Sequence, residues 1–365
     1  MNVRIAGIGK CLPGVDLPGR IVTNQDVIDL LLGHGALKPG SDRPWTADEL
    51  TPGLIENLVG IRQRHWVSPE VNTSDLALCA AEKALKAAGV GWEDIGIIIV
   101  GSSTPEALFP STACLVLDKV LKSKVAAGEW TEHKTREKLR IPAFDVLGAC
   151  TSGLYAADIA RKTLLSPENK KAYGLAVGAE VMSRLMDFTD TNSDLFGDGA
   201  GALVLERSEA SRGIIWAEIG SDPWGAETTY SYGHDTRFHE SPVPQRIYLS
   251  GHEVQKYVLK IIPELVLKTI HNANRGLGLN IKPEDIALFV CHQANARVFE
   301  LPARKLGVPV ERFYVNVERR GNCSSASVLM ALAEAQEEGR LKKGDLFILL
   351  AFGGGLTWAS LLVEA

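Results

Sequence analysis

Two stretches of this chain, 191 residues apart, have nearly the same pattern of charged and apolar residues. Residues 93–101 read Glu-Asp-Ile-Gly-Ile-Ile-Ile-Val-Gly, and residues 284–292 read Glu-Asp-Ile-Ala-Leu-Phe-Val-Cys-His. A second pair, Lys171–Val177 and Gly344–Leu350, follows in the same order. Strand–helix units resemble one another by chance, but ordered matches favour an internal duplication. A duplicated chain is restricted to folds in which one unit occurs twice.

The matched segments belong to a longer alternation of short β-branched runs and longer amphipathic runs. This alternation predicts buried, largely parallel sheets covered by helices, an α/β fold. The predicted strands are Ile95–Val100, Ala143–Leu147, Tyr173–Gly178, Ile286–Cys291, Phe313–Val317 and Leu346–Phe352. The predicted helices are Ser74–Ala88, Ser152–Leu165, Glu253–Asn274 and Ser324–Glu338.

The duplication divides the chain into an N-terminal half, residues 1–207, and a C-terminal half, residues 208–365. The join lies near Glu206–Gly213, where turn-forming and charged residues cluster. The first half contains two predicted inserts. One is the charged, strand-poor stretch 122–140, and the other is the Gly- and Pro-rich stretch 31–53, which we expect to be a surface excursion.

Composition narrows the class of function. A net charge of −5 over 365 residues gives no electrostatic case for nucleic acid or for an anionic membrane surface. The first residues carry charge too early for a secretory signal. The uncharged stretch Leu346–Val363 is interrupted by Gly353–Gly355, so two buried strands explain it better than a membrane span. We therefore expect a cytoplasmic protein.

The six cysteines are scattered, and no Cys-x-x-Cys pair occurs in the sequence. This spacing argues against a zinc site and against a disulfide framework, so no metal is predicted. One of the free thiols is a candidate for chemistry.

Cys150 lies in a turn of small residues between a predicted strand and the predicted helix Ser152–Leu165. At a helix N-terminus, unpaired N–H groups and the helix dipole favour a thiolate. The arrangement parallels the serine elbow of hydrolases, in which backbone N–H groups flank a nucleophile on a tight turn. Most intracellular cysteines are structural, so the assignment depends on partners.

Two candidate partners lie in the second half. His292 ends the apolar strand 286–291, and Asn322 lies in a turn that opens a helix of small residues. A lone histidine or asparagine in a turn is usually structural. Here the histidine and the cysteine occupy strand ends of matching units, where ligands and chemistry collect in parallel sheets.

At these three segments the sequence resembles the thiolase-like condensing enzymes, most closely the β-ketoacyl-acyl-carrier-protein synthase III family. Further matching segments, in family order, are Gly60–His65, Phe196–Ala202 and Ala351–Trp358. The resemblance covers nearly the whole chain. It implies a thiolase-like five-layer αβαβα fold made of two duplicated halves, a homodimer, and a Cys–His–Asn triad at Cys150, His292 and Asn322.

The implied activity is that of an acyltransferase of fatty acid or lipid metabolism without a bound cofactor, whose substrates carry phosphopantetheine on CoA or acyl carrier protein. Cys150 would take an acyl group from a thioester, with the backbone N–H groups of Cys150 and Gly354 as the oxyanion hole. His292 and Asn322 would then stabilise the enolate formed when a malonyl thioester loses CO₂, and the carbanion would attack the acyl-cysteine.

The resemblance extends to three residues outside the triad. Asn295 would hydrogen-bond the phosphopantetheine arm, Arg297 would face the acidic carrier protein, and Phe109 would help to close the acyl pocket across the dimer. A helix start and a surface arginine are the structural alternatives for the first two.

The sequence departs from the family at the substrate entrance. Leu58 and Leu54 stand where CoA-using members carry an arginine and a tryptophan, so the usual clamp on the CoA adenine is missing. Either the primer arrives on a carrier protein or the 31–53 insert supplies other contacts. Glu106 is either a solvated loop residue, which we favour, or a base in a non-decarboxylative relative.

Alternative functions stay open. The same acyl-cysteine would serve acyl transfer, or non-decarboxylative, head-to-head condensation, in secondary metabolism. A non-catalytic scaffold would not need an intact triad. A cysteine hydrolase is disfavoured because no carboxylate partner for the histidine is evident.

Overall fold

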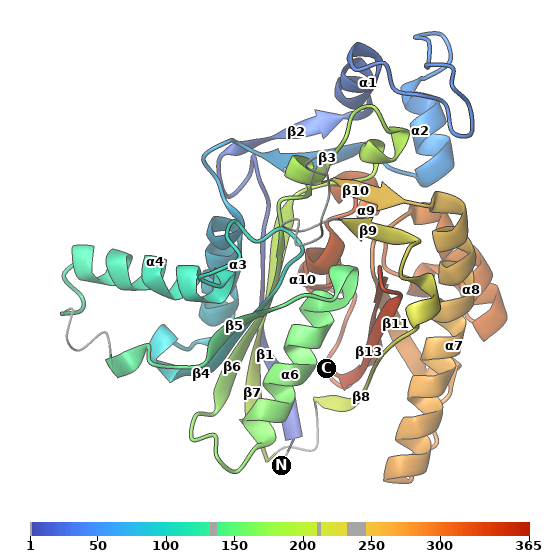
Figure 1. Cartoon of the computed structure of the whole chain (residues 1–365). Coiled ribbons are helices and arrows are strands. Elements are labelled where there is room, and N and C mark those ends of the chain that lie inside the picture. The colour runs from blue at the N-terminus through green and yellow to red at the C-terminus, as the bar shows by residue number, and fades with distance from the viewer. Residues whose placement is uncertain (1, 132–136, 210–212, 232–245) are drawn as a thin grey trace.

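Two mixed β-sheets form the framework of the protein (Figure 1), in a computed structural model that describes residues 2–131, 137–209, 213–231 and 246–365. The first sheet has the strand order β1-β7-β6-β4-β5 and the second the order β11-β12-β13-β8. The strands are β1 (Asn2–Cys11), β4 (Ile95–Gly101), β5 (Ala143–Val146), β6 (Tyr173–Glu180), β7 (Gly199–Ser208), β8 (Ile214–Ser221), β11 (Ile286–Cys291), β12 (Leu346–Gly353) and β13 (Thr357–Glu364).

The two sheets repeat one topology. β1-β7-β6-β4 in the first corresponds to β8-β13-β12-β11 in the second, and in each set only the last pair is parallel. The segments matched in the sequence contain β4 and β11, then β6 and β12. The predicted α/β fold of two similar halves is therefore confirmed. The boundary between residues 207 and 208 stays a prediction; β7 ends at Ser208 and β8 begins at Ile214.

Helices make three further layers, as Figure 1 shows. α6 and α10 lie between the sheets and share one apolar core with both of them. α3 and α4 cover the outer face of the first sheet, and α7 and α8 cover that of the second. The bounds are α1 (Asn24–Gly33), α2 (Pro52–Val59), α3 (Thr73–Ala88), α4 (Thr112–Ala126), α6 (Ser152–Leu165), α7 (Gly251–Leu277), α8 (Glu300–Leu306), α9 (Val317–Arg320) and α10 (Ser327–Glu337).

The sandwich explains why α6 and α10 are rich in small apolar residues. Every residue of α10 from Ser327 to Ala335 is buried, because sheets pack against it on both sides. A helix that is apolar all round belongs in such an interior position. The first residues of these two helices therefore meet inside the molecule.

A smaller unit sits above the first sheet. The hairpin of β2 (Gly19–Thr23) and β3 (Gln63–Val67) packs with α1 and α2 around its own apolar cluster. The 31–53 insert lies here and is mostly exposed, but Trp45 Nε1 donates to Thr191 Oγ1 at 3.0 Å, which ties it to the body. The 122–140 stretch begins in α4, and its residues 132–136 lie outside the described residues.

The predicted strand at Phe313–Val317 is wrong. Only Phe313 pairs with the sheet, in a single parallel bridge to Phe289. The backbone after Phe313 finds its hydrogen-bond acceptor in a side chain and not in a neighbouring strand. Gln293 Oε1 accepts the N–H groups of Asn316 and Val317 at 2.9 and 3.2 Å. The other predicted strands and helices are confirmed with small shifts at their ends.

The uncharged stretch 346–363 forms the antiparallel pair β12–β13, as predicted. Within the described residues, no helix has the length and apolar character needed to cross a membrane.

Candidate active site

Cys150 lies on a sharp turn between β5 and α6. It is the middle residue of a single 3₁₀ turn, Ala149–Thr151, and Ala149 has a left-handed φ of 51°. The next residues fix the turn: Ser152 Oγ donates to the Ala149 carbonyl at 2.7 Å and accepts the Gly148 N–H at 2.8 Å. The structure therefore contains the strand–turn–helix elbow that the sequence predicts.

A glycine turn after β12 lies against the backbone of Cys150. A Cβ atom on Gly353 would lie 2.8 Å from the Cys150 backbone nitrogen, so only glycine lets the two chains approach this closely. Thr357 Oγ1 lies 3.1 Å from the carbonyl oxygens of both Gly148 and Gly354, which links the two turns. Gly354, predicted as an oxyanion donor, is thus one residue from the point of contact with Cys150.

Asn322 is connected to Cys150 through Ser324. The Ser324 hydroxyl lies 3.5 Å from Cys150 Sγ, and the Ser324 N–H donates to Asn322 Oδ1 at 2.9 Å. Asn322 is itself anchored, because its N–H donates to the Leu195 carbonyl at 2.8 Å. Asn322 and Ser324 belong to one segment, residues 322–327, which leads into α10.

His292 meets the same segment. It follows β11 directly, and its Nδ1 lies 2.6 Å from Ser327 Oγ. Its ring packs edge-on against Phe352 with 5.1 Å between centroids, and Phe352 precedes Gly353 in β12. Burial lowers the pKa of His292 to about 3, so its imidazole is neutral near pH 7.

The surroundings of Cys150 disfavour a free thiolate. Burial raises the pKa of Cys150 to about 11; the Ser324 hydrogen bond acts in the opposite direction, and the nearby Glu180 charge adds to the rise. Desolvation therefore favours the neutral thiol of Cys150 in the free protein.

Glu180 is a buried carboxylate beside the site that the sequence analysis missed. It ends β6 and is fully buried. It accepts hydrogen bonds from Ser325 Oγ at 2.6 Å and Thr104 Oγ1 at 2.7 Å, and burial raises its pKa. Glu180 thus fixes the residue next to Ser324. An acidic residue at the end of an otherwise apolar strand was the available signal.

Asn295 and Arg297 lie beside α2. Asn295 Oδ1 accepts the Arg297 N–H at 2.7 Å, and Arg297 Nη2 donates to the Glu56 carbonyl at 3.3 Å. The Asn295 amide also reaches the Leu58 carbonyl at 3.5 Å. Between the described residues, no hydrogen bond joins either side chain to Cys150 or His292. They form a separate group next to Leu58.

Phe109 and Glu106 lie on the loop after β4. The Phe109 side chain is 86% exposed, so it closes no pocket within one chain. The Glu106 carboxylate accepts the N–H and the hydroxyl proton of Ser74, both at 2.8 Å, at the start of α3. Glu106 is thus an exposed residue that caps a helix.

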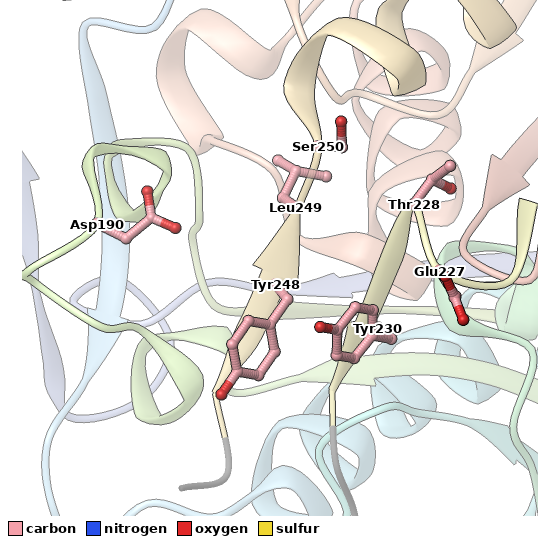
Figure 2. A pocket seen from close by; sticks show the side chains of 7 residues that line it. All are labelled: Asp190, Glu227, Thr228, Tyr230, Tyr248, Leu249 and Ser250. Atoms are coloured by element: carbon pink, nitrogen blue, oxygen red, sulfur yellow. The ribbon is translucent and has the colours of Figure 1, made fainter. Parts of the chain in front are cut away.

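A hollow of about 280 Å³ lies near the glycine turn (Figure 2). Tyr230 in β9 (Thr229–Ser231) and Tyr248 in β10 (Ile247–Leu249) line it with stacked rings, 4.8 Å between centroids. The remaining lining residues are Asp190, Glu227, Thr228, Leu249 and Ser250. Thr229 lies between the lining residues Thr228 and Tyr230, and a Cβ atom on Gly354 would meet its carbonyl oxygen at 2.7 Å. The hollow therefore lies beside the glycine turn of the candidate site.

Comparison with known proteins identifies the family. Family models described as 3-oxoacyl-[acyl-carrier-protein] synthase III and as its C-terminal part match residues 144–223 and 278–365. The chain is 38% identical, over 99% of its length and 98% of the relative's, to the β-ketoacyl-[acyl-carrier-protein] synthase III of Xanthomonas campestris pv. campestris strain 8004. The chain belongs to the β-ketoacyl-[acyl-carrier-protein] synthase III family.

Solved structures agree. The synthase III of Aquifex aeolicus superposes with a TM-score of 0.80 at 30% identity, with each chain fully covered. The priming β-ketosynthase of the R1128 polyketide biosynthetic pathway gives a TM-score of 0.78 at 26% identity, covering 100% of this chain and 96% of that one. The thiolase-like fold predicted from the resemblance is confirmed, as is the reaction class: the chain is a condensing acyltransferase of the synthase III type.

Proposed function

We propose that Cys150 carries an acyl group as a thioester and passes it to a carbanion generated beside His292 and Asn322. The observation that supports this most strongly is the convergence of all three residues on the segment 322–327. Ser324 contacts Cys150 Sγ and Asn322 Oδ1, and Ser327 contacts His292 Nδ1.

In the first half-reaction, the Cys150 thiol gives its proton to solvent, and the resulting thiolate attacks the carbonyl carbon of an acyl thioester. A new carbon–sulfur bond forms, and the carbonyl oxygen takes up negative charge. The N–H groups of Cys150 and Gly354 are the donors for this oxyanion. Collapse of the intermediate breaks the original carbon–sulfur bond and releases the carrier as its thiolate, which takes a proton from water.

In the second half-reaction, a malonyl thioester loses CO₂, and its electron pair forms an enolate whose oxygen needs hydrogen-bond donors. Ser327 Oγ lies 3.4 Å from the donating Gln293 N–H, so its own proton is available to His292 Nδ1, which leaves a proton on Nε2. Asn322 Oδ1 is occupied by the Ser324 N–H, which leaves the amide Nδ2 to donate. A neutral histidine suffices because decarboxylation itself creates the carbanion. The carbanion bonds to the acyl carbon held on Cys150, and the carbon–sulfur bond breaks, which returns Cys150 as its thiolate and releases the β-ketoacyl product.

The carriers of both acyl groups are thiols of the phosphopantetheine type, and we infer acyl carrier protein as a partner. The relatives are β-ketoacyl-[acyl-carrier-protein] synthases, which supports this inference. Asn295 and Arg297 are our candidates for the contacts to the arm and the carrier. No bound cofactor takes part in this scheme. We further propose a cytoplasmic location, which the six unpaired cysteines support.

We further infer a homodimer in which the β5 edge of the first sheet faces a second copy. β5 is the last strand of its sheet in the part of the chain that the structure describes. Exposed apolar side chains surround it, namely Phe144, Leu147, Leu108 and Phe109. An uncovered edge with apolar neighbours is characteristic of an interface. Phe109 would then reach the acyl pocket of the partner.

A second candidate is priming condensation or acyl transfer in a secondary pathway. The similarity to the R1128 priming ketosynthase favours it, as does the exposed Leu58 at the entrance, which is 60% exposed where family members that use CoA have an arginine. The same acyl-Cys150 serves both candidates, and they differ in primer and pathway.

Intact-mass analysis tests the proposal. The chain is incubated with acyl-CoA and acyl-carrier thioesters and then with malonyl-carrier protein. Wild-type protein should gain one acyl mass and release a β-ketoacyl product, whereas Cys150→Ala should gain none. His292→Ala should load normally and lose malonyl decarboxylation by about a hundredfold or more. Cys114→Ser, at an exposed cysteine, is the matched control. Acylation of Cys150→Ala would show that Cys150 is not the acyl carrier. Loading of Cys150 without a β-ketoacyl product would favour acyl transfer without condensation.

A further inference from the structure

Two cysteines and an aspartate that take no part in the proposed chemistry lie together where β1 meets α3. Cys11 is the last residue of β1, Cys79 lies in α3, and Asp16 lies in the turn that follows β1. One ligand atom from each, two sulfurs and a carboxylate oxygen, lie within 4.8 Å of one another.

The packing of α3 on β1 brings the two cysteines together. Cβ atoms on Gly7 and Gly9 would lie 2.2 Å from the carbonyl oxygens of Ala84 and Ala80, so these glycines permit unusually close contact between helix and strand. Same-face residues of a strand are two apart, which puts Cys11 on the face of Gly7 and Gly9. Moving along the strand from Gly7 to Cys11 moves backward along the helix from Ala84 to Cys79.

The aspartate is held in position by its own turn. Asp16 Oδ2 accepts the Leu12 N–H at 2.9 Å, and the Asp16 N–H donates to the Leu12 carbonyl at 2.9 Å. Lys83, one helical turn after Cys79, forms an ion pair with Asp16 Oδ1 at 2.5 Å. The side chain of Asp16 is 19% exposed, so the group is reachable from solvent at one side, while Cys11 is fully buried.

We propose that Cys11, Asp16 and Cys79 form a binding site for a thiophilic divalent cation, with Zn²⁺ as the best match. Two thiolates and a carboxylate supply three of the four tetrahedral positions that Zn²⁺ prefers, and water supplies the fourth. Thiolates bound to one Zn²⁺ lie about 3.8 Å apart, given Zn–S bonds of about 2.3 Å. Because the ligand atoms lie within 4.8 Å of one another, the two sulfurs reach this spacing by a contraction of at most about 1 Å.

The charges around the group balance. On binding, each thiol releases its proton to solvent, so the three ligands carry one negative charge apiece. The two charges of Zn²⁺ and the one of the Lys83 ammonium neutralise them. The Leu12 N–H and the Lys83 ammonium would orient the Asp16 carboxylate by contacting its two oxygens. Each of these oxygens keeps a lone pair that can bind the metal.

Such a site would fasten the end of β1, the turn at residues 12–17 and α3 to one another, and it is independent of the proposed acyl chemistry. Sequence spacing did not reveal it, because the ligands are separated by intervals that match no Cys-x-x-Cys motif. The fold alone brings them together.

Metal titration of the reduced, chelator-treated full chain tests the proposal, with Co²⁺ as the spectroscopic probe and Zn²⁺ as competitor. We expect one equivalent of Co²⁺ with a thiolate charge-transfer band, displaced by Zn²⁺. Cys79→Ser should weaken binding by at least about a hundredfold, since loss of even outer-shell partners costs about ten- to a hundredfold. Cys114→Ser and Cys150→Ala should bind like wild type, and Zn²⁺ should raise the melting temperature of those proteins but not of Cys79→Ser.

Asp16→Asn, which keeps both thiols, is the second variant if Cys79→Ser fails to fold. It should weaken Co²⁺ binding by about tenfold or more. Equal Co²⁺ binding in wild type and either variant would overturn the proposal. So would a chain that binds no Co²⁺. A Cys11–Cys79 cross-linked peptide, with a loss of about 2 Da on mild oxidation, would identify the pair as a disulfide instead.

Discussion

The chemistry of the site at the residue scale depends on how burial acts on two groups. Burial raises the pKa of Cys150 to about 11 and lowers that of His292 to about 3. Both shifts favour the uncharged form. The free enzyme therefore holds a neutral thiol at Cys150 and a neutral imidazole at His292, and the reactive thiolate is a minor species near pH 7.

This state predicts a steep pH dependence of labelling at Cys150. Below its pKa, the thiolate fraction rises about tenfold per pH unit, and the thiolate is the nucleophile. The rate of alkylation by iodoacetamide, followed by mass spectrometry of the Cys150 peptide, should therefore rise about tenfold per unit from pH 7 to 9 without a plateau. The peptide of Cys114 serves as an exposed reference thiol in the same sample. A plateau below pH 8 would mean that the helix N-terminus outweighs burial.

We expect Ser327 to position His292. Ser327→Ala removes the hydroxyl that contacts Nδ1, so the imidazole loses the contact that holds its orientation and tautomer. We expect malonyl decarboxylation to fall by about ten- to a hundredfold, as for other small misplacements of catalytic groups, with acyl loading of Cys150 unchanged. Ser327→Thr, which keeps a hydroxyl, should restore part of the activity. Equal losses in loading and decarboxylation would indicate a general structural defect.

At the element scale, the site exists because two turns from different halves touch. The elbow after β5 and the glycine turn after β12 meet at the Cys150 backbone nitrogen, with Gly353 as the contact. Strand ends of both sheets therefore meet at the candidate site, as expected where strand ends of α/β sheets converge.

Gly353→Ala tests this contact. Its Cβ would lie 2.8 Å from the Cys150 nitrogen and 3.2 Å from the Cys150 Cβ, so the turns must separate and the oxyanion donors must move. We expect acyl loading to fall by about a hundredfold or more, the cost of losing one such donor. Gly53→Ala, at a helical glycine with no atom within 4 Å of its Cβ position, is the control and should load normally. Normal loading by Gly353→Ala would place the oxyanion elsewhere.

Sequence reasoning could single out Cys150, His292 and Asn322 as candidates because each follows an apolar strand or opens a helix, a pattern that is local. It could not predict that Glu180, Ser324 and Ser327 contact the candidate residues or their neighbours. Their partners lie far away in sequence, as with the 145 residues between Glu180 and Ser325. The same limit explains the wrong strand at 313–317, where a glutamine side chain takes the place of a neighbouring strand.

For the whole molecule, the duplication was the strongest guide. Two copies of a strand–helix unit predicted two similar sheets, and the common strand order of both sheets agrees. What the repeat could not predict is where the copies differ. Among the described residues, β5 is the last strand of the first sheet, whereas the equivalent place beside β11 has only the single bridge of Phe313. In the same part of the chain, no strand pairs with the outer edge of β5, and exposed apolar side chains surround it.

That edge carries the last prediction, on assembly. Light scattering after size-exclusion chromatography should give about 79 kDa, twice the 39.4 kDa of one chain. Leu108→Asp puts a charge into the inferred interface, where Leu108 is 61% exposed, and should shift the mass toward 39.4 kDa. Leu277→Asp changes a comparably exposed leucine, 52%, at the end of α7 and should stay dimeric. The proposal that the β5 edge is the dimer interface would be wrong if the wild-type chain ran as a monomer or if both variants dissociated equally. Phe109 would then have no partner pocket to close.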